Sequence, residues 1–305
     1  MTEYIKLQVK MVARKMIEFG INPIIGSLLL SVIFIFGSYL LFLKTELAGY
    51  IYMFIALSLV IKLSEGRRKD FLKSVFSISK YYKIRVMENI SVILPFLLVL
   101  IYKQQYIESS VLVSTSALLV FIRIDINNNY TIPTPYYRFP FEFLVGFRST
   151  FYLFIIVCFL VFMSIRVGNF NLGAFSVIVV YFIIINYYLK LENEYYVWSF
   201  SCSPEMFILN KIKTSLWYST SLVIPIAIAL GLFFSENIYT LLIIIVLGYV
   251  YLITIILAKY SSYPTEMNLP QVILIGFSFL FPPLLLGIIP FFYIRSTKHL
   301  NEILK

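Results

Sequence analysis

Long runs of apolar residues alternate with short polar stretches over most of this 305-residue sequence. Several runs approach or exceed the roughly 20 residues that an α-helix needs to cross a bilayer. Charged residues make up only 13% of the chain, whereas soluble domains usually contain roughly 25%. A soluble core of ordinary size has no use for so many apolar runs. The sequence therefore predicts an all-α polytopic membrane protein.

The apolar runs predict about eight transmembrane helices. We expect them at 21–43, 47–63, 88–103, 110–124, 149–166, 172–189, 215–234 and 238–258. A further apolar stretch at 271–294 contains Pro282-Pro283 at its centre. Proline removes a backbone donor and interrupts a regular helix, so this stretch is either a ninth span or a broken, re-entrant hairpin. The charge distribution favours the hairpin, because it keeps the basic C-terminal tail on the same side as the N-terminus.

The first 20 residues predict an amphipathic helix in the membrane interface. Apolar residues recur at helical spacing, and Lys6, Lys10 and Arg14 run along a neighbouring stripe. An apolar face with a basic flank is typical of a helix that lies in the headgroup region. The chain then divides into a first membrane half, a linker with a second interfacial segment, a second membrane half, and a C-terminal membrane segment with a basic tail. Their expected bounds are 1–20, 21–124, 125–148, 149–258 and 259–305, with cytosolic loops at 64–88 and 190–214.

Basic residues indicate which side of the membrane each loop faces. The segment from Glu65 to Asn89 holds seven of the 25 Lys and Arg residues, which predicts a cytoplasmic location. With both termini inside, the outer loops contain only Lys44, Lys103 and Arg166. The net charge of +10 is then explained by orientation and by anionic lipid headgroups, and we expect no nucleic-acid partner.

Short matches suggest that the two halves are related. Phe76-Ser77-Ile78-Ser79 is echoed 124 residues later by Phe200-Ser201-Cys202-Ser203, and Gly49 matches Gly173 at the same offset. Ser203-Pro204-Glu205 is a favourable helix start, because Ser caps free amides and Pro suits the first helical position. By the repeat, Ser79 is expected to cap the matching helix. Related halves are frequent in transporters.

Recognisable catalytic chemistry is absent from the sequence. Nothing fits a P-loop, a metalloprotease motif or a nucleophile elbow, and the single histidine, His299, lies in the polar tail. We therefore expect no enzymatic activity, no metal and no cofactor in this chain. The centres of the predicted spans also lack ionisable residues, which argues against a proton-coupled carrier. Glu142, between Arg138 and Arg148, is expected to form an interfacial ion pair.

The pattern resembles the membrane (permease) subunits of bacterial ABC transporters, especially the exporter type. The basic elbow helix, Met1–Gly20, precedes the first span. The stretches FLKSVFSISKYYKIRVMEN (71–89) and SFSCSPEMFILNKIKTSLW (199–217) look like coupling helices, and no P-loop is present. This sequence departs from the family in having eight or nine predicted spans and two coupling elements rather than six and one.

The resemblance implies a bacterial inner-membrane protein whose N-terminus is cytoplasmic and whose partner is a cytosolic ATPase subunit. It implies export of a lipid, a peptide or another hydrophobic substrate, and it leaves open a homodimer or a heterodimer with another permease. Membrane lipids are further partners. The residues expected to couple to the ATPase are Ser79, Tyr81, Tyr82, Arg85, Ser203, Glu205, Met206 and Lys211.

Three other readings compete with the permease. The main one is a non-catalytic membrane scaffold or assembly subunit, in which the basic loops recruit partners and nothing is translocated. A lipid-modifying enzyme lacks its motifs, and a secondary carrier lacks buried charges. An associated ATPase favours the permease over the scaffold.

Overall fold

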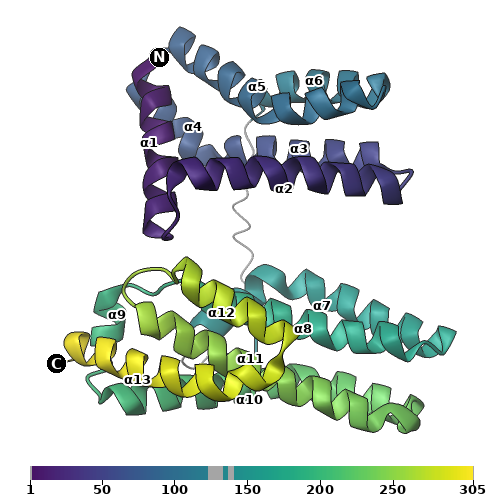
Figure 1. The fold of residues 1–305 in the computed structure, drawn as a ribbon, viewed down its shortest axis with the longest axis vertical. Helices are drawn as coiled ribbons and strands as arrows, with labels where there is room; N and C mark the ends of the chain where they lie inside the picture. Colours follow the sequence, from purple (N-terminus) through teal and green to yellow (C-terminus); the bar gives the residue numbers. More distant parts are fainter. Residues whose placement is uncertain (1, 123–132, 137–140, 305) are drawn as a thin grey trace. The chain divides into compact units, whose positions relative to one another are not determined.

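The computed structural model describes residues 2–122, 133–136 and 141–304, and every regular element within these residues is helical. The prediction of an all-α protein is confirmed. The chain divides into two compact units, Met1–Tyr130 (unit 1) and Thr131–Lys305 (unit 2), both drawn in Figure 1. Each unit is described by itself.

Unit 1 begins with the amphipathic helix that the sequence predicts. Its helices are α1 (Thr2–Glu18), α2 (Pro23–Lys44), α3 (Ala48–Leu63), α4 (Gly66–Val75), α5 (Ile78–Tyr102) and α6 (Tyr106–Phe121). After α1 the chain turns at Gly20, whose φ of 87° suits glycine. The Asn22 side chain then caps α2 by accepting a hydrogen bond from the Ile24 amide at 3.0 Å, and Pro23 is the first helical residue. In consequence α1 runs across the direction of α2 (Figure 1).

The core of unit 1 lies where α3, α5 and α6 pack on one another. Tyr52, Ile93, Leu100 and Leu112 are buried there. Helix α2 joins this group at its edge through a hydrogen bond between the Ser38 and Tyr52 hydroxyls, and most of its apolar side chains stay exposed. Such exposure is expected of a helix that faces lipid.

Unit 2 repeats this arrangement and adds to it. Its elements are α7 (Phe141–Val167), α8 (Phe170–Leu189), α9 (Glu194–Trp198), α10 (Pro204–Phe233), η1 (Ser235–Asn237), α11 (Ile238–Ser262), α12 (Leu269–Leu280), η2 (Pro282–Leu284) and α13 (Leu285–Ile303). Helices α8, α10 and α11 pack on one another as α3, α5 and α6 do. Helix α7 packs along α8, and α13 packs along α11.

Helices α5 and α10 correspond residue by residue. Each begins one residue after a serine at the N-cap position, Ser77 and Ser203, so the two helices align at an offset of 126. Buried positions then coincide along both helices. The coincident pairs are Tyr81 and Phe207, Arg85 and Lys211, Asn89 and Ser215, Ile93 and Ser219, and Leu100 and Ile226.

Six helical segments among the described residues are long and apolar enough to cross a membrane. They are Pro23–Lys44, Ile78–Tyr102, Phe141–Val167, Phe170–Leu189, Pro204–Phe233 and Ser235–Ser262. Helices α3 and α6 contain 16 residues each, or about 24 Å, which falls short of the roughly 30 Å of a hydrocarbon core. The structure thus supports a polytopic membrane protein, but the predicted count of eight spans is not confirmed.

The C-terminal apolar stretch is a broken helical hairpin. Helix α12 ends at Leu280, the short η2 element contains Pro282 and Pro283, and α13 returns. The break therefore falls at the prolines, as the sequence predicts. In Figure 1 this yellow hairpin turns back before it reaches the far ends of α7 and α8.

Candidate functional site

Four buried ionisable side chains meet at one end of unit 2, and we call them the four-charge cluster. Glu142 lies in the first turn of α7, Glu192 follows α8, Lys211 lies in α10 and Lys259 lies near the end of α11. Their side chains are between 1% and 10% exposed. The cluster therefore joins three long helices and one loop at a single point.

Lys211 forms the shortest contacts of the four-charge cluster. Its Nζ atom lies 2.7 Å from Glu142 Oε1 and 2.5 Å from Glu192 Oε1. Lys259 Nζ lies 3.5 Å from an oxygen of each carboxylate. Burying an unpaired charge is very costly, whereas a paired and hydrogen-bonded set is tolerated. The cluster contains two acidic and two basic residues, so their formal charges cancel.

Aromatic side chains surround the four-charge cluster. The Tyr260 hydroxyl donates a hydrogen bond to Glu192 Oε2 at 2.6 Å, and the Tyr263 hydroxyl donates to the Glu192 backbone carbonyl at 3.0 Å. Burial, followed by the charge of Glu192, raises the pKa of Tyr263, so its hydroxyl remains a donor. The rings of Tyr196 and Phe207 each lie 5.6 Å from Lys211 Nζ, where ring faces attract a cation.

The Glu192 carboxylate is held in its charged form. Burial alone would raise its pKa, but a hydrogen bond from Glu142 and the ammonium groups of Lys211 and Lys259 outweigh burial and lower the pKa to about 2. A carboxylate with two cations nearby behaves in this way. The loop between α8 and α9 is thus tied to the helices by a charge that persists at neutral pH.

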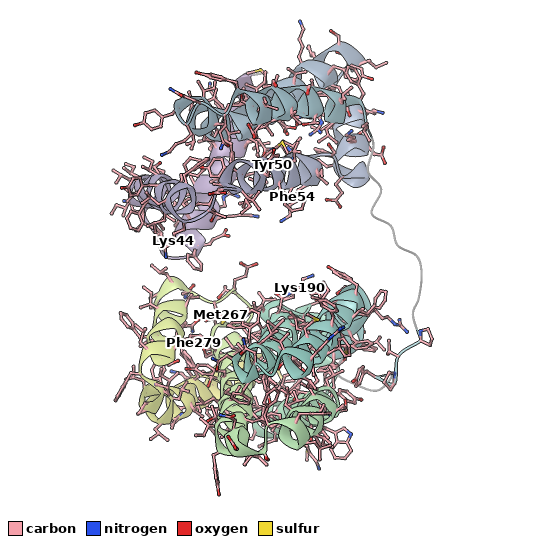
Figure 2. All side chains as sticks on the ribbon, turned by 90° about the vertical axis from the view of Figure 1, so that its right-hand side faces the viewer. Lys44, Tyr50, Phe54, Lys190, Met267 and Phe279 are labelled. Atoms are coloured by element: carbon pink, nitrogen blue, oxygen red, sulfur yellow. The ribbon has the colours of Figure 1, made fainter. Side chains whose placement is uncertain are left out.

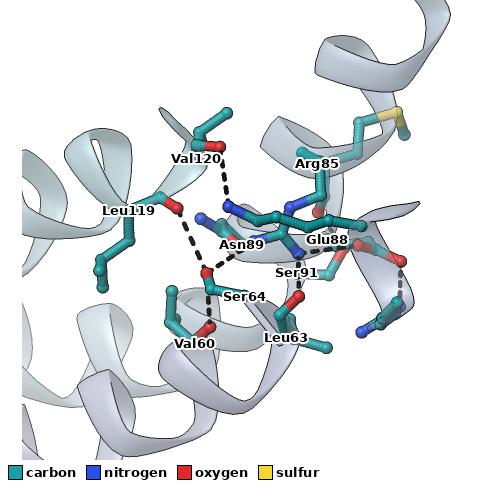
Figure 3. Close-up of polar contacts among 12 residues, drawn as sticks. Val60, Leu63, Ser64, Arg85, Glu88, Asn89, Ser91, Leu119 and Val120 are labelled. Carbon is teal, nitrogen blue, oxygen red and sulfur yellow. Dashed lines mark hydrogen bonds and ion pairs between the residues drawn. The ribbon is translucent and has the colours of Figure 1, made fainter. Parts of the chain in front are cut away.

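Unit 1 has a smaller cluster at the corresponding helix, shown in Figure 3. Arg85, fully buried in α5, donates to the Leu63 carbonyl at 2.7 Å and to the Ser64 hydroxyl at 2.9 Å, and it pairs with Glu88 at 3.2 Å. Glu88 also pairs with Arg68 and accepts a hydrogen bond from the Tyr4 hydroxyl at 2.6 Å. This cluster connects α1, α4 and α5 with the end of α3.

Two further contacts extend the unit 1 cluster to α6. The buried Lys69 donates to the backbone carbonyls of Val120 and Ile122 at the end of α6. Asn89 donates to the Ser116 carbonyl at 2.9 Å. Arg85 and Lys211 therefore each lie about two turns after the exposed start of α5 or α10.

The predicted coupling residues fall into an exposed set and a buried set. Ser79, Tyr82, Ser203, Glu205 and Met206 are exposed at the starts of α5 and α10. Tyr81, Arg85 and Lys211 are buried, so in this structure they anchor the helix starts from inside and present no surface to a partner.

One predicted cap is wrong. Ser203 caps α10 through a hydrogen bond that its hydroxyl accepts from the Met206 amide at 3.3 Å. Ser79, however, lies inside α5, whose N-cap residue is Ser77, and that side chain forms no capping hydrogen bond. The sequence match at an offset of 124 aligned Ser79 with Ser203, whereas the helices align at 126.

Sequence reasoning also missed the partners of Glu142. It expected a pair with Arg138 or Arg148. Arg138 lies outside the described residues, and the ion pairs that Glu142 forms within them include Lys211 and Lys259. Each member of the four-charge cluster lies near the end of a predicted span. The presence of opposite charges at the same predicted end was the available signal, but their pairing depends on how the helices assemble.

The described residues contain no group of His, Cys, Asp and Glu side chains that could hold a metal ion. Comparison with protein-family models, with curated proteins and with solved structures finds no significant match to this chain. The fold and its apolar helices define the class as an α-helical, multi-pass membrane protein. The features of this structure that can indicate a function are the two polar clusters and the exposed helix starts beside them.

Proposed function

We propose that this chain is the permease subunit of an ATP-driven transporter of exporter type, with eight spans and a re-entrant C-terminal hairpin. It binds a separate cytosolic ATPase through the exposed starts of α5 and α10. The chain lies in a bacterial inner membrane with its N-terminus in the cytoplasm. The equivalent placing of Arg85 and Lys211 carries this proposal.

These two residues connect a docking surface to the membrane helices. Each lies eight residues after its N-cap serine and is buried. Arg85 is bonded to the end of α3, and Lys211 to α7 and to the loop after α8. A force applied at Tyr82 or Met206 thus passes along the helix to its buried cation and, through the hydrogen bonds or ion pairs of that cation, to the neighbouring elements. Coupling by discrete, packed elements of this kind is how distant sites influence one another.

Purification of the tagged protein from its native membrane tests the proposal. We expect a P-loop ATPase to co-purify in fixed ratio and to be lost with Tyr82→Glu and Met206→Glu. Both residues are exposed, so the fold should survive the substitutions. Tyr102→Glu is the matched control, since Tyr102 is an exposed tyrosine at the opposite end of α5.

Three results are informative. Loss of the ATPase with Tyr82→Glu and Met206→Glu but not with Tyr102→Glu supports coupling through the helix starts. Unchanged ATPase binding and stimulation in all variants contradicts the assignment of these surfaces. A stable complex with other proteins and no ATPase replaces the permease by the scaffold alternative.

A further inference from the structure

A groove of about 540 Å³ lies on unit 2 between α7, α8, α11 and α12. Its lining is mainly apolar and includes Leu153, Val179, Phe182 and Ile255. It is separate from the four-charge cluster and from the exposed helix starts, because no residue of either lines it. The groove is therefore a second feature of unit 2, distinct from the four-charge cluster.

Three aromatic rings from three helices form one wall of the groove. Phe279 of α12 stacks on Tyr251 of α11 with centroids 4.3 Å apart and an interplanar angle of 8°. The ring of Phe182 in α8 also stacks on Phe279, with centroids 6.4 Å apart and an interplanar angle of 24°. The Tyr251 hydroxyl is used internally, since it donates to the Ser278 carbonyl at 2.8 Å. This wall offers flat apolar surface and no free polar group.

One polar side chain in the lining has no partner among the described residues. Asn186 lies in the last turn of α8, and no hydrogen bond to its amide occurs in the described part of the chain. The Asn186 side chain is exposed near the polar end of the helix, so its amide is open to a ligand in the groove. Ester or phosphate oxygens of such a ligand could accept hydrogen bonds from it.

The charge next to Asn186 favours an anionic ligand. Lys190 follows four residues later, where α8 ends, and it is exposed and forms no ion pair within the described residues. Figure 2 shows Lys190, Met267 and Phe279 along the same side of unit 2. From Asn186 to Val179 the apolar part of α8 extends about 10 Å. The groove is thus polar at the end formed by Asn186, with the charge of Lys190 just beyond it along the chain, and apolar toward the other end.

We propose that this groove binds one anionic glycerophospholipid. Its acyl chains lie against Phe182 and the Tyr251–Phe279 stack, and its ester and phosphate oxygens meet Asn186 and Lys190. The order of polar and apolar surface matches a lipid of the leaflet that faces the coupling loops. As the assignment of a substrate class, this inference rests on the proposed function, and the bound lipid is then the cargo.

Native mass spectrometry of the full chain tests the binding. The protein is purified in detergent with equal amounts of phosphatidylglycerol and phosphatidylcholine. We expect one retained phosphatidylglycerol per chain, and about tenfold weaker retention in Phe182→Ala and Asn186→Leu. Lys190→Ala should remove the preference for phosphatidylglycerol over phosphatidylcholine.

Two matched variants control for general effects. Phe159→Ala removes a ring from α7 that is as exposed as Phe182, 59% against 56%, but lies outside the groove. Lys298→Ala removes an exposed charge of the same unit. Equal lipid retention in the wild type and in both groove variants would overturn the site. Equal binding of the two lipids by the wild type would overturn its anionic character.

A second measurement separates cargo from resident lipid. The complex with its ATPase is placed in phosphatidylcholine nanodiscs with or without phosphatidylglycerol. We expect phosphatidylglycerol to raise ATP hydrolysis in the wild type and Phe159→Ala but not in Phe182→Ala. Tight binding without stimulation overturns the cargo assignment. If no ATPase co-purifies, the proposed function fails while the mass measurement still decides whether the groove holds lipid.

Discussion

The two units place a buried cation at the same position of equivalent helices but surround it differently. Arg85 in unit 1 is bonded largely to backbone and hydroxyl oxygens, and its one carboxylate partner, Glu88, is shared with the partly exposed Arg68. Lys211 in unit 2 lies between two carboxylates with a second buried lysine opposite. Guanidinium can satisfy several acceptors with a rigid fork of donors, whereas an ammonium group is a point charge. The equivalent buried cation is therefore held mainly by hydrogen bonds in unit 1 and by buried ion pairs in unit 2.

This difference predicts that unit 2 responds far more to the loss of one charge. Lys211→Met leaves two buried carboxylates with only Lys259, and removing one partner of a buried pair costs about 3–5 kcal/mol. In unit 1, Arg68→Met also removes one cation from the charged cluster, and it should cost about 0–1 kcal/mol because Arg68 is partly exposed and Glu88 keeps Arg85 and Tyr4. Thermal unfolding in detergent measures both. Equal losses of stability would contradict the comparison.

The ion pairs of Glu192 also predict how the stability of unit 2 depends on pH. The pKa of Glu192 is lowered to about 2 in the folded protein from roughly 4.3 in an unfolded chain. Its contribution to stability is complete above the unfolded value and is lost as the pH falls toward 2. Lys211→Met removes one of the cations that lower this pKa, so the folded and unfolded values should lie closer together. Acid should then begin to destabilise the variant at the same pH as the wild type, but the total loss of stability on acidification should be smaller.

We also expect the two units to differ in the stability that they lose when a closely packed glycine is replaced by alanine. A Cβ atom on Gly248 would lie 2.4 Å from the Tyr181 ring, whereas one on Gly49 would meet the end of the flexible Gln105 side chain. We expect Gly248→Ala to cost about 1–3 kcal/mol, as overpacking usually does, and Gly49→Ala to cost less. Gly231→Ala is the control, since nothing lies within 4 Å of that position. Thermal unfolding that ranks Gly49 above Gly248 would refute this order.

The smallest expected contrast concerns the two N-cap serines. Ser203→Ala removes a side chain that accepts the Met206 amide and should cost about 0.5–2 kcal/mol. Ser77 forms no such bond, so Ser77→Ala should be close to neutral. Hydrogen exchange at the first turns of α10 and α5 reads this effect locally. Faster exchange in α5 after Ser77→Ala would show that the caps are equivalent.

Local sequence patterns correctly predicted those features that interactions between neighbouring residues determine. The amphipathic helix near the N-terminus, the Ser203-Pro204 start and the break at Pro282 all appear in the structure. The cap at Ser79 failed because the repeated letters Phe-Ser-x-Ser fix no helix register. The partners of Glu142 lie as far away as Lys259, and only the packing of α7, α8, α10 and α11 brings them together. Asn186 was not singled out, because an isolated amide near a span end becomes informative only beside an apolar groove.

The four-charge cluster has a consequence for how the protein is made. Synthesis delivers Glu142, Glu192 and Lys211 before Lys259, so the nascent chain carries two carboxylates and one ammonium group until α11 is complete. We expect the first three helices of unit 2 to remain loosely associated at this end during that interval, and the arrival of Lys259 to fix them. Helix packing at this end of unit 2 is therefore expected to be completed only after Lys259, near the end of α11, has been synthesised.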